Sequence, residues 1–332
     1  MTLSDFSQGY TVESDFLITC VLKRSHLKIQ TSKIRHQYQK IRLYSEGMES
    51  YFFAKREQNI CPLSLLNLHL TKITQHILTN HMNQYGLIGY PLSHSFSKKY
   101  FSDKFEQEGI KNHAYNLFPI ERIGNLPMLL ESTEDLKGLN VTIPYKEYVL
   151  DFLDEIDEAA AEIGAVNTIR ITNGKLKGYN TDVYGFEISL HKLLGKNTIK
   201  NALILGTGGA SKACAYVLNK LNIPFKYVSR TKKDGQFTYP ELSRQIIDNH
   251  QLIINTTPLG TFPNADTCPD IPYEDLGSEH YLYDLVYNPE VSEFLKRGKE
   301  RGAAIKNGLE MLHLQAEKAW EIWNTPQSNY IQ

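Results

Sequence analysis

Residues 202–211 read Ala202-Leu203-Ile204-Leu205-Gly206-Thr207-Gly208-Gly209-Ala210-Ser211. Four consecutive apolar residues predict a buried β-strand, and a helix is expected at residues 212–221. Glycines between a strand and a helix let backbone amides approach a pyrophosphate, whose charge the helix N-terminus favours. Ser211 stands where the simplest pattern has Gly or Ala, which weakens the match slightly. The stretch predicts a dinucleotide-binding domain, with contacts from Gly206, Thr207, Gly208, Gly209 and Ala210.

The turn after the next expected strand (225–228) bears on which dinucleotide is bound. It reads Ser229-Arg230-Thr231-Lys232-Lys233. Enzymes that use NAD usually carry an acidic residue about here, which grips the ribose 2′-hydroxyl. Hydroxyl-bearing and basic residues instead suit a 2′-phosphate, so this turn predicts NADP. An ordinary solvated turn is the alternative interpretation.

A second informative stretch lies upstream, at Asn140-Val141-Thr142-Ile143-Pro144-Tyr145-Lys146. Its apolar and polar residues alternate as in a half-buried strand, and Pro144 marks the end of that run. We expect Lys146 to open a helix over residues 147–161. A lysine held by rigid backbone on both sides suits a positioned catalytic amine. The alternative is an ordinary surface lysine in the first turn of a helix.

The order of strands, helices and turns in the rest of the sequence predicts an α/β fold. Short apolar strands alternate with helical segments from residue 84 onward, which is typical of a mostly parallel sheet covered by helices on both faces. Asn173-Gly174 predicts a tight hairpin. The run Leu252-Ile253-Ile254-Asn255 is expected to be a strand whose following loop borders a nicotinamide.

Two polar residues near helices have open interpretations. Asp182 precedes an apolar-periodic segment and is either the N-cap of that helix or a functional carboxylate. In the last helix, Gln315 shares one stripe with Leu312, Ala319 and Ile322, so it is expected to face inward. A buried amide needs partners. It is therefore either a satisfied core group or a ligand contact.

Composition excludes several classes of protein. The chain has 332 residues, which favours two domains, and 36 basic against 37 acidic residues argue against a nucleic-acid or membrane-surface protein. Its four cysteines (Cys20, Cys61, Cys214 and Cys268) form no CxxC pair and no zinc spacing, so we expect reduced thiols, a cytoplasmic protein and no metal. No apolar run reaches the roughly 18 residues of a membrane span, and no signal peptide is evident.

Residues 1–82 differ from the rest. Only Gly9 and Gly47 of the 21 glycines, and Pro62 of the 13 prolines, lie before Met82. This segment is interpreted either as a basic accessory arm or as an upstream extension with Met82 as the working start. We favour the extension.

Taken together, the motifs resemble the shikimate dehydrogenase family over residues 83–332. The residues that carry the resemblance are His94-Ser95-Phe96-Ser97, the 140–146 run, Ala165-Val166-Asn167-Thr168, Asn180-Thr181-Asp182, the glycine turn, Tyr287-Asn288-Pro289 and Gly308-x-x-Met311-Leu312-x-x-Gln315. Lys98 replaces a proline and Ser292 a threonine that are usual in the family, and both changes look tolerable. Nothing is carried over to the N-terminal extension.

The resemblance implies a fold and a reaction. The fold would comprise a substrate domain (83–184 with 305–332, so that the C-terminal helix returns to it) and a Rossmann-type NADP domain (185–304). The reaction would be the reversible reduction of 3-dehydroshikimate to shikimate by NADPH in aromatic amino-acid biosynthesis. The alternatives are an NAD-using quinate/shikimate dehydrogenase and a non-catalytic shikimate sensor. The expected partners are small molecules, neither nucleic acid nor membrane, and both a monomer and a homodimer remain open.

The resemblance also implies roles for individual residues. Lys146 and Asp182 would be the catalytic pair. Ser95 and Ser97 would hold the substrate carboxylate with Tyr287 nearby; on extended chain, serines at i and i+2 point the same way, whereas the alternative for Ser97 is a helix N-cap. The ring hydroxyls would be bound by Thr142, Asn167, Asp182 and Gln315. The cofactor would be lined by the glycine turn, Ser229, Arg230, Thr231, Lys232, Lys233, Leu285 and Gly308.

Overall fold

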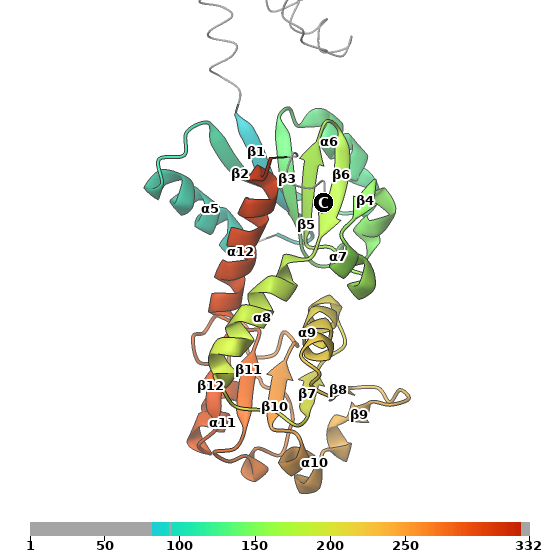
Figure 1. Cartoon of the computed structure of the whole chain (residues 1–332). Helices are drawn as coiled ribbons and strands as arrows, with labels where there is room; N and C mark the ends of the chain where they lie inside the picture. The colour runs from blue at the N-terminus through green and yellow to red at the C-terminus, as the bar shows by residue number, and fades with distance from the viewer. Residues whose placement is uncertain (1–81, 93–94, 327–332) are drawn as a thin grey trace, which may run out of the picture. The chain divides into compact units, whose positions relative to one another are not determined.

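The computed structural model describes residues 82–92 and 95–326 (Figure 1). The interpretations of the N-terminal segment therefore concern residues that lie, Met82 apart, outside the described chain, as does His94 of the serine motif. The described residues form two six-stranded sheets with helices packed against them. The predicted α/β fold is confirmed.

The first sheet is mixed and has the order β2-β1-β3-β5-β6-β4. β1 pairs in parallel with β2 and β3, whereas β5 is antiparallel to β3 and β6. Asn173 and Gly174 join β5 to β6 with φ values of 54° and 78°, so the predicted hairpin is confirmed. The strands are β1 (Asn83–Gly89), β2 (His113–Pro119), β3 (Leu136–Val141), β4 (Glu155–Ile156), β5 (Thr168–Thr172) and β6 (Lys175–Tyr179).

The helix expected over residues 147–161 is wrong. The chain instead forms a 3-10 helix η3 (Tyr148–Phe152), the short strand β4 and the helix α7 (Glu158–Ile163). The backbone N–H groups of Asp154 and Asp157 donate to carbonyls of β6, at Leu176 and Gly178, so this segment lies along the edge of the sheet. These pairings with a strand later in the chain outweigh the helical propensity of the segment.

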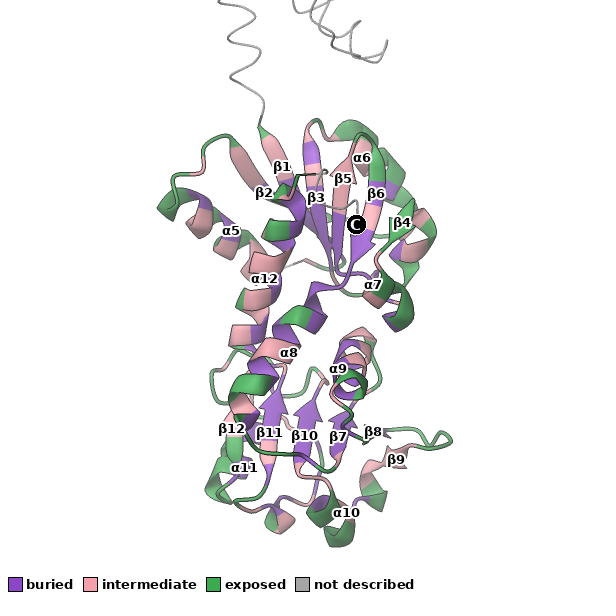
Figure 2. Ribbon diagram, in the orientation of Figure 1, coloured by how far each residue is buried: buried purple, intermediate pink, exposed green. Residues whose placement is uncertain are grey.

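The second sheet is entirely parallel, with the order β12-β11-β10-β7-β8-β9. This is the doubly wound order, in which ligands bind beyond the carboxyl ends of the strands. Figure 2 shows that β7 and β10 are buried along their whole length. The strands are β7 (Ala202–Leu205), β8 (Phe225–Ser229), β9 (Phe237–Thr238), β10 (Leu252–Asn255), β11 (Tyr281–Asp284) and β12 (Ala304–Lys306).

Helices surround the second sheet and connect it to the first. The helix α9 (Gly209–Lys220) follows β7 directly, as the glycine turn predicted. The sheet is also accompanied by α10 (Arg244–Asn249), α11 (Glu293–Glu300) and the 3-10 helices η4 (Tyr239–Glu241) and η5 (Tyr273–Asp275). In the first sheet, α5 (Phe96–Gln107), η2 (Ile123–Asn125) and α6 (Leu126–Ser132) separate the early strands.

Two long helices, α8 (Thr181–Leu194) and α12 (Leu309–Asn324), lie side by side and connect the sheets (Figure 1). They approach closely at Gly185, where an added Cβ would lie 2.5 Å from the Met311 carbonyl oxygen. Farther along α12, the Trp323 indole donates to the Ile169 carbonyl of β5 at 2.9 Å. The predicted return of the C-terminal helix to the first sheet is therefore confirmed.

Candidate active site

The central pair is Lys146 and Asp182, whose Nζ and Oδ2 atoms are 2.7 Å apart. Their side chains are only 19% and 12% exposed, so this is a partly desolvated ion pair. The Lys146 carbonyl accepts from the Val166 N–H at 2.7 Å, which fixes the lysine backbone in a turn rather than in the predicted helix. Asn180 is the N-cap of α8 and Asp182 is the second residue of the helix, so the capping interpretation of Asp182 is wrong.

Asn167 determines how the Asp182 carboxylate is oriented. Its Nδ2 donates to Asp182 Oδ1 at 2.8 Å. Its Oδ1 accepts from the Thr181 N–H at 2.7 Å and from the Thr181 and Thr168 hydroxyls, each at 3.1 Å. Because the acceptor side of the amide is fully engaged, its donor side must face the carboxylate.

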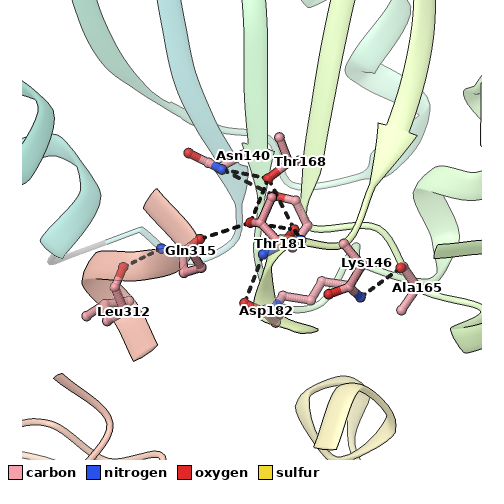
Figure 3. Close-up of polar contacts among 10 residues, drawn as sticks. Asn140, Lys146, Ala165, Thr168, Thr181, Asp182, Leu312 and Gln315 are labelled. Carbon is pink, nitrogen blue, oxygen red and sulfur yellow. Dashed lines mark hydrogen bonds and ion pairs between the residues drawn. The ribbon is translucent and has the colours of Figure 1, made fainter. Parts of the chain in front are cut away.

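This network continues into the first sheet through residues to which the sequence assigned no role (Figure 3). Asn140 Nδ2 donates to Thr168 Oγ1 at 3.1 Å, and the Tyr115 phenol donates to Asn140 Oδ1 at 2.7 Å. Asn140, Thr168 and Thr181 all stand inside the quoted motifs, which was the available signal. The result is a buried chain of hydrogen bonds that ends at Lys146.

Gln315 enters the same network from α12, as Figure 3 shows. It is 8% exposed, so the predicted inward orientation is confirmed. Its Oε1 accepts from the Thr181 hydroxyl at 3.4 Å, and its Nε2 donates to the Leu312 carbonyl at 3.0 Å. The amide therefore has protein partners on both sides.

The two serines are arranged differently from the prediction. Ser95 is the N-cap of α5 and accepts from the Lys98 N–H at 3.4 Å. Ser97 lies inside the helix, so the extended geometry at i and i+2 is wrong, and so is the N-cap interpretation of Ser97. Burial raises the pKa of the Tyr115 phenol well above its ordinary value, and the neighbouring Ser97 side chain opposes that rise. Ser97 is therefore close to the Tyr115 end of the network.

Thr142 and Tyr287 are placed by contacts with Gly89 and Phe96, respectively. Thr142 follows β3, and its methyl group is close to Gly89, where an added Cβ would lie 2.5 Å from it. Tyr287 follows β11 and makes an edge-to-face contact with Phe96, with ring centroids 5.9 Å apart. The structure therefore brings Tyr287 next to the residue between the two serines.

The glycine turn fits a dinucleotide pyrophosphate. Gly206 has φ of 104°, and a Cβ there would lie 2.8 Å from Thr256 Oγ1. A Cβ on Gly208 would meet nothing within 4 Å, and one on Gly209 would touch Lys146 carbons at 3.9 Å. No side chain caps α9, so the N–H groups at its start are available to a phosphate, apart from that of Ser211, which donates to the Gly208 carbonyl at 3.0 Å. The turn also lies directly beside Lys146.

The other residues predicted to bind the cofactor fall into two groups. Gly308 lies against Leu285, because an added Cβ would come within 2.3 Å of the Leu285 carbonyl oxygen. Arg230, Thr231 and Lys233 are exposed in the turn after β8, beside the buried Ser229. Lys232 is engaged differently: its Nζ donates to Glu241 at 2.6 Å and to the Gln236 carbonyl at 3.0 Å.

Two surface cavities lie away from this network. One of about 550 Å³ is lined by residues of η4, η5 and α11, and one of about 610 Å³ by residues of α8 and α12. Neither is lined by Lys146 or Asp182. The site is therefore defined by its polar contacts rather than by the size of a cavity.

The described part of the chain contains two free cysteines and neither a metal-binding cluster nor a membrane-spanning helix. Within it, no cluster of three His, Cys, Asp or Glu residues is placed to hold a metal ion. Cys214 and Cys268 are free, and burial raises the pKa of the Cys214 thiol well above its usual range. None of the helices in this part is both long and apolar enough to cross a bilayer.

A doubly wound parallel sheet, a glycine turn that fits a pyrophosphate and an adjacent Lys–Asp pair define a dinucleotide-dependent oxidoreductase. Comparison with known proteins specifies the class further. Residues 87–169 match the family model described as shikimate dehydrogenase substrate binding domain. The chain belongs to the shikimate dehydrogenase family, as this match and relatives that it covers over most of their length show.

Relatives that this chain matches over most of their length support the family assignment. A shikimate dehydrogenase (NADP(+)) of Methanosphaera stadtmanae is 37% identical over 265 residues, which cover 74% of this chain and 92% of the relative. The shikimate dehydrogenase (NADP(+)) of Clostridium beijerinckii is 41% identical over 256 residues, which cover 73% of this chain and 92% of the relative. The crystal structure of shikimate 5-dehydrogenase from Thermus thermophilus with NADP(H) and shikimate has 30% identity and a TM-score of 0.64, covering 73% and 94%.

Proposed function

We propose that the protein catalyses the reversible reduction of 3-dehydroshikimate to shikimate with NADPH, a cytoplasmic step of aromatic amino-acid biosynthesis. The observation that carries the proposal is the 2.7 Å contact between Lys146 and Asp182 directly beside Gly209 of the glycine turn. Family membership and the NADP-dependent activity named for the relatives support it.

In this proposal the protein manages one proton. When bound, the nicotinamide supplies the hydride in one direction and accepts it in the other. As hydride reaches the substrate carbonyl, charge develops on oxygen, and the Lys146 ammonium donates a proton to it. Asp182 holds the ammonium in place, and Asn167 holds Asp182. In the oxidation direction the same amine, once neutral, accepts the hydroxyl proton.

The substrate-binding roles are proposed for the residues that the family resemblance implies, and contacts among these residues support them. Ser95, Ser97 and Tyr287 are proposed to bind the carboxylate, supported by the contact between Phe96 and Tyr287. Thr142, Asn167 and Gln315 are proposed to bind ring hydroxyls. Asn167 and Gln315 both contact Thr181, so their amides share one hydrogen-bonded network with Asp182.

The cofactor-binding roles are proposed for the glycine turn (206–210), for Leu285 and Gly308, and for the turn 229–233. In that turn the 2′-phosphate is assigned chiefly to Arg230, Thr231 and Lys233, because the three donors of Lys232 are taken up by Glu241 and Gln236. The proposal divides the chain as predicted from the sequence: 83–184 with 305–332 for the substrate and 185–304 for NADP.

An assay of dinucleotide reduction with shikimate or quinate, each with NADP⁺ or NAD⁺, tests this function. We expect turnover with shikimate and NADP⁺ to exceed the other three combinations. A preference for quinate with NAD⁺ would favour the quinate/shikimate dehydrogenase, and binding of shikimate without turnover would favour a sensor. A chain beginning at Met82 is expected to keep full activity, as monomer or homodimer.

A further inference from the structure

A buried carboxylate, Asp284, ends β11 in the second sheet. It is 0% exposed, and its Oδ1 accepts from Asn255 Nδ2 at 2.9 Å and from the Val286 N–H at 3.0 Å. The Ser292 hydroxyl donates to its Oδ2. A charge in the core is costly unless donors surround it. Three donors from three segments converge on this carboxylate.

Asn255 connects Asp284 to the loop that follows β10. It ends β10, lies opposite Asp284 in the parallel pair and is also 0% exposed. Its Oδ1 accepts from the Thr257 N–H at 3.0 Å and from the Thr257 hydroxyl at 2.7 Å. Its carbonyl accepts from the Leu285 N–H at 3.0 Å. One carboxylate therefore fixes the carboxyl ends of two neighbouring strands, where doubly wound sheets bind their ligands.

The segment that Asp284 fixes carries residues already assigned to the site. The Val286 N–H donates to Asp284, and the Val286 carbonyl accepts from the Gly308 N–H at 3.1 Å. Gly308 also lies against the Leu285 carbonyl. Tyr287 follows Val286 in the chain. The hydrogen bond between Val286 and Asp284 therefore also restrains the backbone at Tyr287.

We propose that Asp284 is a positioning residue of the cofactor site, which holds residues 285–287 and the Asn255–Thr257 turn in the geometry that receives NADP(H). It acts only through these residues and the Gly308 backbone. The inference rests on the proposed function, because it takes Leu285 and Gly308 to line the cofactor.

The test uses Asp284→Asn in the full chain. The substitution keeps the volume and the Oδ1 acceptor but turns an NH₂ donor toward Ser292, whose hydroxyl then has no acceptor there. We expect the Kd for NADPH, from fluorescence titration, to rise about tenfold, as expected for losing a hydrogen bond to a charged group. Shikimate affinity is expected to fall much less, because Tyr287 is the one residue of the held segment that is assigned to the substrate. In the protein without cofactor, amide exchange is expected to quicken at Thr257, Val286 and Gly308 but not through the rest of the second sheet.

Ser292 provides a second pair of variants in case Asp284→Asn does not fold. Ser292→Ala removes one donor and is expected to weaken NADPH binding, whereas Ser292→Thr retains the hydroxyl and should restore it. Asp270→Asn, at an exposed carboxylate before η5, is the matched control and should leave Kd and amide exchange unchanged.

Two results would overturn the inference. One is wild-type NADPH affinity and wild-type amide exchange in both single variants, Asp284→Asn and Ser292→Ala. The other is a loss of protection throughout the second sheet, which would make Asp284 a plain core residue. Wild-type protein that binds NADPH but does not oxidise shikimate would contradict the proposed function and leave the positioning role standing. Wild-type protein that binds no NADPH would contradict both.

Discussion

Lys146 Nζ and Asp182 Oδ2 lie 2.7 Å apart although 36 positions separate the two residues in the sequence. The pairing depends on the first sheet, in which β3, β5 and β6 are neighbours. Lys146 lies in the turn after β3, and Asp182 lies in the first turn of α8, shortly after β6. Sheet order thus brings an amine and a carboxylate together beside the glycine turn.

Replacing Asp182 with Asn tests whether its charge matters. The amide fills the same space but no longer anchors the Lys146 ammonium. We expect kcat to fall roughly 10²-fold or more, the range of positioned acid–base assistance, with little change in the thermal midpoint. Steady-state kinetics and thermal unfolding check this. Glu147→Gln removes the nearby exposed partner of Lys212 and should have little effect. Equal kcat values in the two variants would contradict the assignment of Asp182.

Arg230 and Lys232 are expected to differ in importance for cofactor choice. Arg230→Ala should raise KM for NADPH about tenfold or more and hardly change KM for NADH, because it removes a charged hydrogen bond to the 2′-phosphate. Lys232→Ala should have a smaller effect, since Lys232 is bound to Glu241, whose pKa this contact and the Thr238 hydrogen bonds lower to about 2. Parallel kinetics with both dinucleotides decide. An unchanged NADPH to NADH ratio in Arg230→Ala would remove the 2′-phosphate interpretation.

The close contact between α8 and α12 predicts a stability effect at Gly185. A Cβ there would lie 2.5 Å from the Met311 carbonyl oxygen, so Gly185→Ala must push the helices apart. We expect a loss of about 1–3 kcal/mol in the free energy of unfolding, measured by urea denaturation. Because α12 carries Gln315, KM for shikimate should also rise. Gly124→Ala, where the added Cβ meets nothing within 4 Å, is the control and should be neutral. Equal stability of both variants would argue against tight packing at this contact.

Asp284 predicts a pH dependence of stability. Burial raises its pKa from 3.8 to about 6, against the opposing effect of its hydrogen bonds. The folded state therefore binds this proton more tightly than the unfolded state, so this contribution favours folding at low pH and is lost as pH rises from about 4 to 6. The shift corresponds to roughly 3 kcal/mol.

The measurement is the difference in unfolding free energy between Asp284→Asn and wild type from pH 4 to 7. The asparagine cannot titrate, so its relative stability should increase with pH across that window. Carboxylates with lowered pKa values, such as Glu310, contribute the opposite slope to both proteins and cancel in the difference. A difference that stays flat would mean that Asp284 has an ordinary pKa.

The sequence predicted those elements that local chemistry determines. The apolar runs at 202–205 and 252–255 are buried strands with those bounds, and Asn173-Gly174 makes its hairpin. The helix expected over 147–161 failed because residues 154–157 pair with β6, a contact that propensity does not encode. The extended serine geometry failed because α5 begins at Phe96, with Ser95 as its cap.

The site was predictable as a list of residues but not as a network. Asn140 and Thr168 face each other because β3 and β5 pair antiparallel in that register, and only the register makes them hydrogen-bond partners. Thr181 joins them from the start of α8. The engagement of Lys232 by Glu241 likewise depends on how the loop after β8 folds back. Such contacts require tertiary structure.

The role of Lys146 is tested by the rate of hydride transfer in a single turnover, with shikimate and NADP⁺ saturating, for wild type and Lys146→Ala. We expect that rate to fall about 10²–10⁴-fold, while the Kd for shikimate changes far less. Lys212→Ala, which removes a half-buried lysine of α9 that pairs with Glu147, is the control and should match wild type. A hydride-transfer rate that Lys146→Ala leaves unchanged, or one that falls only in step with shikimate affinity, would contradict the role of Lys146 in the transition state.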